Sequence, residues 1–210
     1  MNGVNDLLVS FMAYSDFTVT KVKKSFEIQT KEGDRFLPEI EPIEPSLALV
    51  AFLEESLPLA SMLKSEKAKS EFLIGPVLLE VRRLLDRKVS LFSGEEFSVE
   101  PEVGLSGICD FVISQSAEQL EIEAPVIVIV EAKRSDINSG MGQCMAEMVA
   151  AQRFNLQAGR DAAPVYGCVS SGILWRFLRL EGRLVTIESE DYALKPIDRL
   201  LGILVWMARI

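Results

Sequence analysis

The sequence predicts an α/β protein in which helices flank a mixed central sheet. The first observation is the run Val126–Val130, five consecutive β-branched residues that offer no polar position on either face of a strand. The second is a pair of stretches with helical periodicity, residues 65–87 and 142–156, which precede and follow it. A strand that is apolar on both faces must be covered on both sides, and helices of this kind can cover it. A hairpin and an apolar helix are expected at the C-terminal end.

Length and composition favour one globular core. The chain has 210 residues, of which 49% are hydrophobic. We expect an acidic accessory segment with a proline-containing connector over residues 1–60, and the α/β domain over residues 61–210. The apolar run near the C-terminus, Leu200–Ala208, is far shorter than the ~20 residues of a membrane-spanning helix. Because a secretory signal pattern is also lacking, we expect a cytoplasmic protein with no membrane partner.

The accessory segment is expected to contain two helices. Thr20 is a candidate N-cap for a short helix with Val22 and Phe26 on one face. Three prolines between positions 38 and 45 then favour extended backbone. Ser46 is the candidate N-cap of the second helix, which we expect Pro58 to interrupt.

The helix expected over residues 65–87 carries an acid on its apolar side. At 100° per residue, four aliphatic residues form one stripe: Ile74, Leu78, Val81 and Leu85. Glu71 lies inside this stripe, whereas Glu66 and Glu80 project to the other side. A kink at Gly75-Pro76 would let Glu71 turn to solvent instead, so both orientations stay open.

Strand signals follow in an antiparallel meander, with strands expected over residues 88–92, 95–100, 105–114 and 126–130. Turns are expected at Ser93-Gly94 and over residues 114–120. Asp110 interrupts an otherwise apolar strand, and the hairpin that follows can place it beside Glu131. Side chains two apart share one face of a strand, so Glu131 and Lys133 should project together at the end of the central strand. Ligands gather at the carboxyl ends of strands in open α/β sheets.

The helix expected over residues 142–156 is rich in small residues, which suits close packing on a sheet. Gln143 and Glu147 lie one turn apart on one face, and both also fit ordinary solvated positions. A right-handed crossover would place the next strand, VYGCVSSG, parallel to the central one. A hairpin turning at Glu181-Gly182 and a closing helix over residues 192–210 complete the chain. The closing helix is apolar nearly all round, which suits burial between elements or a homodimer contact.

Composition limits the chemistry that the chain can perform. It contains no histidine, which excludes histidine bases and most transition-metal sites. Three widely spaced cysteines, Cys109, Cys144 and Cys168, fit reduced thiols rather than disulfides or zinc. Catalysis would therefore use carboxylates, lysine and a hard cation. The net charge of −9 is the wrong sign for a broad nucleic-acid-binding surface.

The order of these features resembles the PD-(D/E)XK nuclease superfamily, whose restriction-endonuclease-like core runs α-β-β-β-α-β. Asp110 and the tripeptide Glu131-Ala132-Lys133 match its motif, with Gln143 in the next helix and Glu71 or Glu66 in the preceding one. The stretch VSSGILWRFLRLEG is similar to the nuclease domains of type I restriction enzymes. The resemblance covers residues 65–188, and Cys109 replaces the motif's proline.

The resemblance implies Mg²⁺-dependent (or Mn²⁺-dependent) hydrolysis of DNA, with the metal held by Asp110, Glu131 and the carbonyl of Ala132. Lys133 would act on the phosphate, while Gln143 and the helix glutamate, Glu71 or Glu66, position water or metal. The alternative is a nuclease-fold module without activity, which acts as a regulatory or assembly subunit with a protein partner. The net charge favours that alternative, and the intact Asp-Glu-Lys set favours the enzyme. DNA binding without chemistry is the third reading, and it lacks a basic face.

Overall fold

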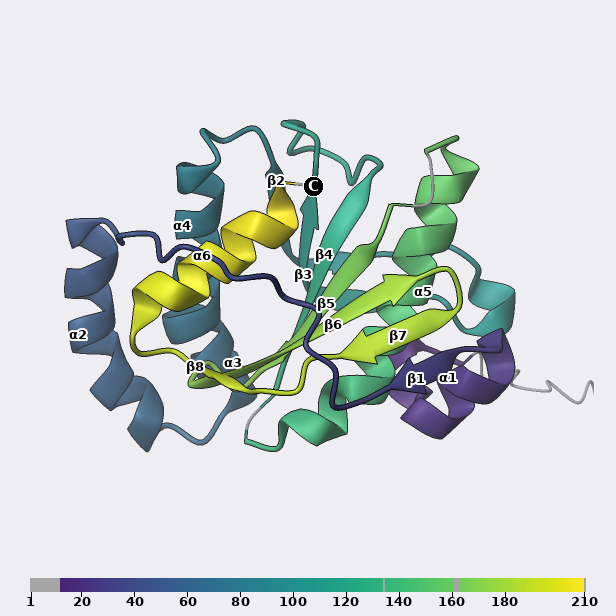
Figure 1. Cartoon of the computed structure of the whole chain (residues 1–210), viewed down its shortest axis with the longest axis horizontal. Coiled ribbons are helices and arrows are strands. Elements are labelled where there is room, and N and C mark those ends of the chain that lie inside the picture. The colour runs from purple at the N-terminus through teal and green to yellow at the C-terminus, as the bar shows by residue number, and fades with distance from the viewer. Residues whose placement is uncertain (1–11, 134, 161–162, 210) are drawn as a thin grey trace, which may run out of the picture.

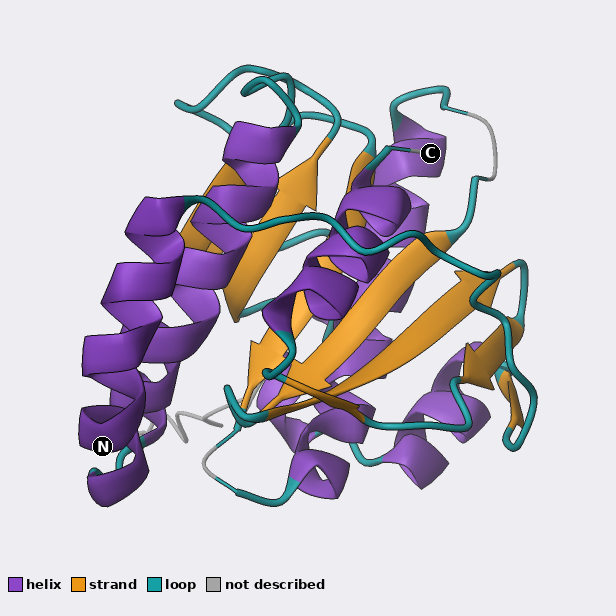
Figure 2. Cartoon of the chain, turned by 60° about the vertical axis from the view of Figure 1, so that its left-hand side comes forward, coloured by secondary structure: helices purple, strands orange, loops and turns teal. Residues whose placement is uncertain are grey.

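A computed structural model describes residues 12–133, 135–160 and 163–209. It has a central mixed sheet of eight strands flanked by helices, which confirms the predicted fold class at this level (Figures 1 and 2). The strands are β1 (Gln29–Lys31), β2 (Ser90–Glu96), β3 (Ile108–Ser114), β4 (Val126–Ala132), β5 (Val165–Ser170), β6 (Leu174–Glu181), β7 (Leu184–Ile187) and β8 (Tyr192–Ala193).

Strand β4 lies inside the sheet, whose order is β1-β7-β6-β5-β4-β3-β2, with β8 paired to β6. It runs antiparallel to β3 and parallel to β5, as the sequence predicts. All seven of its residues are buried. The predicted hairpin turn at Glu181-Gly182 also forms, since β6 pairs with β7 across it and Gly182 has a φ of 57°. The β4 strand is therefore covered on both faces, and it is hydrogen-bonded to a neighbouring strand along both edges.

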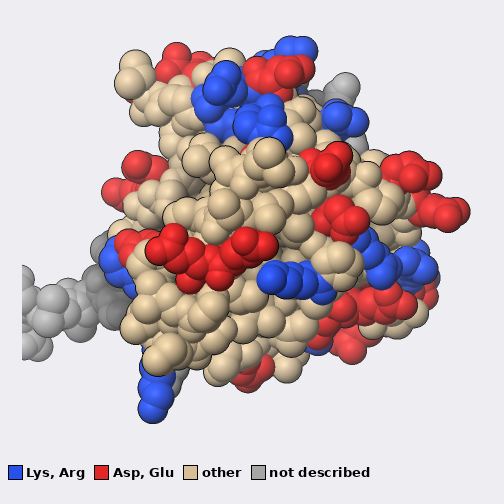
Figure 3. Space-filling model, turned by 90° about the vertical axis from the view of Figure 1, so that its left-hand side faces the viewer, with Lys and Arg blue, Asp and Glu red and all other residues tan. Residues whose placement is uncertain are grey.

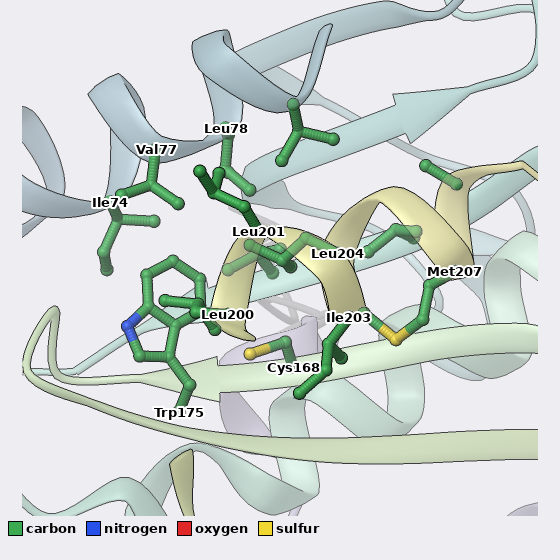
Figure 4. Close-up of a cluster of buried hydrophobic side chains, with 14 of the residues drawn as sticks. Ile74, Val77, Leu78, Cys168, Trp175, Leu200, Leu201, Ile203, Leu204 and Met207 are labelled. Carbon is green, nitrogen blue, oxygen red and sulfur yellow. The ribbon is translucent and has the colours of Figure 1, made fainter. Parts of the chain in front are cut away.

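Two apolar cores lie on opposite sides of the sheet. One contains side chains from α2 (Leu47–Met62), α4 (Gly75–Leu84) and α6 (Ile197–Ala208), and the other contains those of α1 (Val19–Phe26) and α5 (Met141–Gln157). In the first core, α6 packs between α4 and the sheet, and its residues Leu201 and Leu204 lie close to Leu78 of α4 (Figure 4). Trp175 from β6 is fully buried beside them. Burial between elements is thus the correct reading of the closing helix, although it begins at Ile197 rather than Tyr192, which lies in β8.

The helix expected over residues 65–87 is interrupted by a π-helical turn. It consists of α3 (Glu66–Lys69), the π turn η2 (Ser70–Ile74) and α4, with Ser65 as N-cap. The predicted stripe from Ile74 to Leu85 is buried. A π turn winds fewer degrees per residue than an α-helix, so residues before Ile74 leave the predicted phase. This change alters which acid of the helix faces the sheet.

Two predicted interruptions are wrong. The expected turn at Ser93-Gly94 lies inside β2, where Gly94 has a φ of 68°. The chain reverses later, at η3 (Pro101–Val103). The core therefore has three consecutive antiparallel strands, β2, β3 and β4, rather than four. Likewise α2 continues through Pro58, which is exposed, so that water can bond the carbonyl that proline leaves without a partner.

The N-terminal sixty residues contribute to both cores and to the sheet. Strand β1 pairs in parallel with β7, and Leu49 and Leu53 of α2 belong to the same core as α4. The first helix begins two residues earlier than expected, with Thr18 rather than Thr20 as N-cap, and Val22 and Phe26 are buried as predicted. Ser46 caps α2 as predicted. The first eleven residues of the expected accessory segment lie outside the described residues.

Among the described residues, no helix is long and apolar enough to cross a membrane.

Candidate active site

The site lies where β4 ends, between the start of β3 and the end of β5. Phe111 pairs with Val130 in the antiparallel register, so the preceding residue, Asp110, lies next to Glu131. On the other side Ala132 pairs with Ser170, and the backbone nitrogen of Lys133 donates to the Ser170 carbonyl at 2.7 Å. The three residues of the Glu-Ala-Lys segment are thereby held by both neighbouring strands.

Glu131, the acid of this segment, is buried, with 1% of its surface exposed. One carboxylate oxygen accepts a hydrogen bond from Lys133 Nζ, and the other accepts one from Gln143 Nε2 at 2.9 Å. Burial and repulsion from Asp110 raise the pKa of Glu131 to about 8, although the ion pair with Lys133 acts in the opposite direction. The carboxylate is therefore poorly compensated by the protein alone.

Lys133 links the sheet to the first helix. Its ammonium pairs with Glu131 and lies 3.8 Å from the carboxylate of Glu66 at the start of α3. Burial alone would lower the pKa of Lys133, but the carboxylates of Glu131 and Glu66 raise it above its ordinary value. The lysine stem packs on Gly140, where an added Cβ would lie 2.9 Å from Cε. Lys133 is therefore held as a cation in a defined position.

Asp110 is fixed by the neighbouring strand rather than by a cation. Its Oδ2 accepts a hydrogen bond from the backbone nitrogen of Ala132 at 2.8 Å. In the part of the chain that the structure describes, its side-chain hydrogen bonds use only that oxygen. Asp110 therefore presents a second oxygen for another ligand.

Gln143 and Glu147 lie beneath the carboxylate of Glu131. Gln143 Nε2 donates to Glu131 and, at 3.0 Å, to Glu147 Oε1. Glu147 is fully buried, and its Oε2 has no partner among the described residues. Burial raises the pKa of Glu147 well above its usual range, and Glu131 adds to the effect. Solvation is thus the wrong reading of Glu147, and its spacing of one turn from Gln143 on a helix rich in small residues was the signal for its position.

The acids of the first helix divide between the site and the surface. Of the two orientations left open for Glu71, the structure has the one that faces solvent, because the side chain is 53% exposed and pairs with Lys67 at 2.8 Å; its expected place in the site is therefore wrong. Glu66, which was expected on the other side, approaches Lys133. Glu80 is buried but bonds Ser46 and Arg83, away from the site. The π turn accounts for this exchange of roles between Glu71 and Glu66.

The three cysteines are free and buried, and burial raises the pKa of each thiol. A neutral, enclosed thiol is a poor nucleophile. The nucleophile of any reaction here must therefore come from another source, such as water.

The donor set fits magnesium better than a metal that needs a full protein cage. No group of three or more Cys, Asp or Glu side chains that could hold a metal ion occurs within residues 12–133, 135–160 and 163–209. Magnesium commonly uses one or two carboxylates and completes its shell with water and substrate phosphates. Asp110 and Glu131 can supply these carboxylates, because they lie side by side at the end of β4 and Asp110 keeps one oxygen free of side-chain hydrogen bonds among the described residues.

Comparison of the chain with protein-family models, with curated proteins and with solved structures finds no significant match.

Proposed function

We propose that this protein hydrolyses phosphodiester bonds of DNA with Mg²⁺ or Mn²⁺, through a site of the PD-(D/E)XK type. The observation that carries the proposal is the convergence of four groups at the end of β4: Asp110, Glu131, Lys133 and Gln143. They come from three elements and were matched to the nuclease motif from the sequence alone. A solvated strand end would not hold a carboxylate that is 1% exposed between a lysine and a glutamine.

The order of elements supports the same proposal. From α4 the chain runs through β2, β3 and β4 to α5 and β5, which is the α-β-β-β-α-β order of the nuclease core. The Asp lies on the second strand of this unit and the Glu-Ala-Lys segment at the end of the third. Fold alone does not define activity, so the weight rests on the side chains.

Each residue has a role that follows from its contacts. Asp110 and Glu131 would hold the metal, which when bound supplies a Lewis acid and lowers the pKa of water. The Lys133 ammonium would neutralise charge that develops on the scissile phosphate, and the carboxylates of Glu131 and Glu66 favour its protonated form. Gln143 holds the Glu131 carboxylate in place through its amide.

The test is Mg²⁺-dependent cleavage of plasmid and linear DNA by the full chain. Glu131→Ala and Lys133→Ala are each expected to lower the rate at least ~100-fold, as the loss of an electrostatic group in a site does. The exposed pair supplies matched controls, because Glu71→Ala and Lys67→Ala remove the same residue types outside the site. Cleavage that survives in both site variants would exclude the proposal.

A second candidate is a module with this fold but without cleavage, which serves as a regulatory or assembly subunit. The net charge of −9 favours it, as does the fact that both Glu131 oxygens are already bonded within the protein. It predicts that the wild-type chain neither cleaves DNA nor binds Mg²⁺ in calorimetry. Binding of Mg²⁺ without cleavage of DNA would direct the search to RNA substrates.

A further inference from the structure

A groove between α2 and α4 lies on the face opposite to the α1–β7 side of the molecule (Figure 1). It has a volume of about 580 Å³ and is lined by apolar side chains from both helices, among them Phe52, Pro76 and Leu79. Phe52 is 43% exposed and Leu79 is 59% exposed. Two large apolar side chains on facing helices therefore meet water over an open groove.

Exposed apolar residues are frequent on the two helices that form the groove, and Phe52 and Leu79 line it. Six of the fourteen large apolar side chains that are exposed among the described residues belong to α2, the segment after it, or α4: Leu47, Phe52, Leu59, Met62, Leu63 and Leu79. Single exposed aliphatic residues need no explanation, but Phe52 and Leu79 line one groove from two helices, and apolar side chains that are exposed together in this way mark an interaction surface. The other eight are spread over the rest of the chain.

Charges of opposite sign flank the apolar groove. The helices are antiparallel, since Ser46 at the start of α2 bonds Glu80 near the end of α4, and Ser56 bonds the carbonyl of Phe72. At the Ser46 end lie three arginines: Arg82, Arg83 and Arg87.

Within the described residues, Arg87 has no ion pair, so the basic end is only partly neutralised. At the Ser56 end lie the exposed acids Glu55 and Glu71, of which Glu71 is paired with Lys67. Figure 3 views this side and shows a group of basic side chains toward its upper end with acidic ones beside it, a group of acidic side chains across its middle with basic ones beside it, and uncharged surface between the two groups.

We propose that this face binds a second copy of the chain around a twofold axis through the Phe52–Leu79 region. Such an interface must be self-complementary, because each patch meets its symmetric equivalent. A twofold axis through an apolar centre places the basic end of one copy on the acidic end of the other, twice. A purely acidic partner would satisfy the arginines but would repel Glu55.

The inference is independent of the proposed nuclease activity, because the readout is molecular mass. Sedimentation velocity over a concentration series should show the full chain as a dimer that dissociates on dilution. Leu79→Glu should weaken association by at least ~30-fold, the effect of losing a central contact. Leu120→Glu is the control, since Leu120 is 90% exposed in the loop between β3 and β4.

Charge reversal gives a sharper test. Arg87→Glu and Glu55→Lys should each weaken self-association by roughly tenfold, because like charges then face each other. An equal mixture of the two variants should form heterodimers of wild-type strength. In such a heterodimer the new Glu at position 87 of one copy faces the new Lys at position 55 of the other, and the second contact keeps its original Arg87 and Glu55. A wild-type chain that is monomeric at all concentrations, a dimer that Leu79→Glu leaves intact, or a mixture that shows no recovery would each overturn the proposal.

Discussion

The carboxylate of Asp110 on β3 accepts a hydrogen bond from the backbone nitrogen of Ala132 on β4, at 2.8 Å. The bond joins two residues that lie twenty-two positions apart in the sequence. It orients the Asp110 carboxylate beside Glu131 and uses only one of its oxygens. The two acids are thus placed together by the sheet before any cation binds.

This bond makes Asp110→Asn a clean probe of metal binding. The amide oxygen of asparagine can still accept from Ala132, so the fold is retained, but the negative charge is lost. We expect Mg²⁺ binding, measured by isothermal titration calorimetry, to weaken by at least ~10-fold, because Mg²⁺ sites depend on one or two carboxylates.

Asp86→Asn is the control for that titration, since Asp86 is exposed and pairs only with Lys88 at 3.8 Å. It should leave the Mg²⁺ affinity unchanged. An Asp110→Asn protein that binds Mg²⁺ as tightly as the wild type would remove Asp110 from the metal site.

The buried pair of Glu131 and Lys133 predicts a stability effect that grows with pH. An acid whose pKa is raised in the folded state, here to about 8, stabilises the fold below its unfolded pKa and loses that contribution as pH rises through 8. Without Lys133 the ionised carboxylate would be buried with no close cation. Lys133→Met should therefore lower the free energy of unfolding by about 2 kcal/mol at pH 9 and by much less at pH 5.

Urea unfolding at both pH values measures this difference. Lys67→Met removes a lysine from an exposed pair and should leave stability unchanged at either pH. If Lys133→Met had the same cost at pH 5 and pH 9, the pair would not control the titration of Glu131.

Periodicity was enough to predict the parts of the fold that depend on burial alone. The β-branched run Val126–Val130 is buried on both faces, and the stripe from Ile74 to Leu85 is buried as counted. The spacing of two between Glu131 and Lys133 likewise placed both side chains together. In each case a local repeat and the global packing demand the same orientation.

Two of the failures occur where the backbone geometry changes locally, and the third concerns a buried acid. The π turn at Ser70–Ile74 rotates Glu71 out and leaves Glu66 at the site, and no sequence repeat signals such a turn. Gly94 was taken as a turn, but a positive φ also fits within a strand. Glu147 was expected to be solvated, because glutamate side chains are almost never fully buried without a cation. In the structure its carboxylate instead accepts a hydrogen bond from the buried Gln143 amide.

Gln143 is predicted to stabilise the fold by bridging two buried acids, Glu131 and Glu147. Gln143→Leu would leave Glu131 Oε2 and Glu147 Oε1 without their shared donor, and each unsatisfied buried group is costly. We expect the free energy of unfolding to fall by about 2 kcal/mol, measured by urea denaturation at pH 7. Gln152→Leu on the same helix is the control, because Gln152 bonds the Gly182 carbonyl at an exposed position. Equal effects of the two changes would show that the buried amide has no special role.

Glu80 should stabilise the fold by joining α2 to α4, with no part in catalysis. Its carboxylate accepts hydrogen bonds from Arg83 and from the backbone nitrogen of Ser46 at 2.7 Å, and these bonds, that of Arg83 first, lower the pKa of Glu80. A lowered pKa gives stability that is present above the unfolded pKa and is lost as pH falls through the folded one. Since Arg83 is half exposed and screened by water, Glu80→Gln should cost only about 1 kcal/mol at pH 7.

That cost should shrink as pH falls below 4.5, the ordinary pKa of the group, in thermal unfolding followed by circular dichroism. Glu39→Gln, at an exposed position, provides the comparison and should show no such dependence. DNA cleavage at pH 7 should be the same in Glu80→Gln as in the wild type, because Glu80 bonds Ser46 and Arg83 rather than any residue of the β4 site. A loss of cleavage with stability retained would instead assign the acid of the first helix to Glu80 and remove Glu66 from that role.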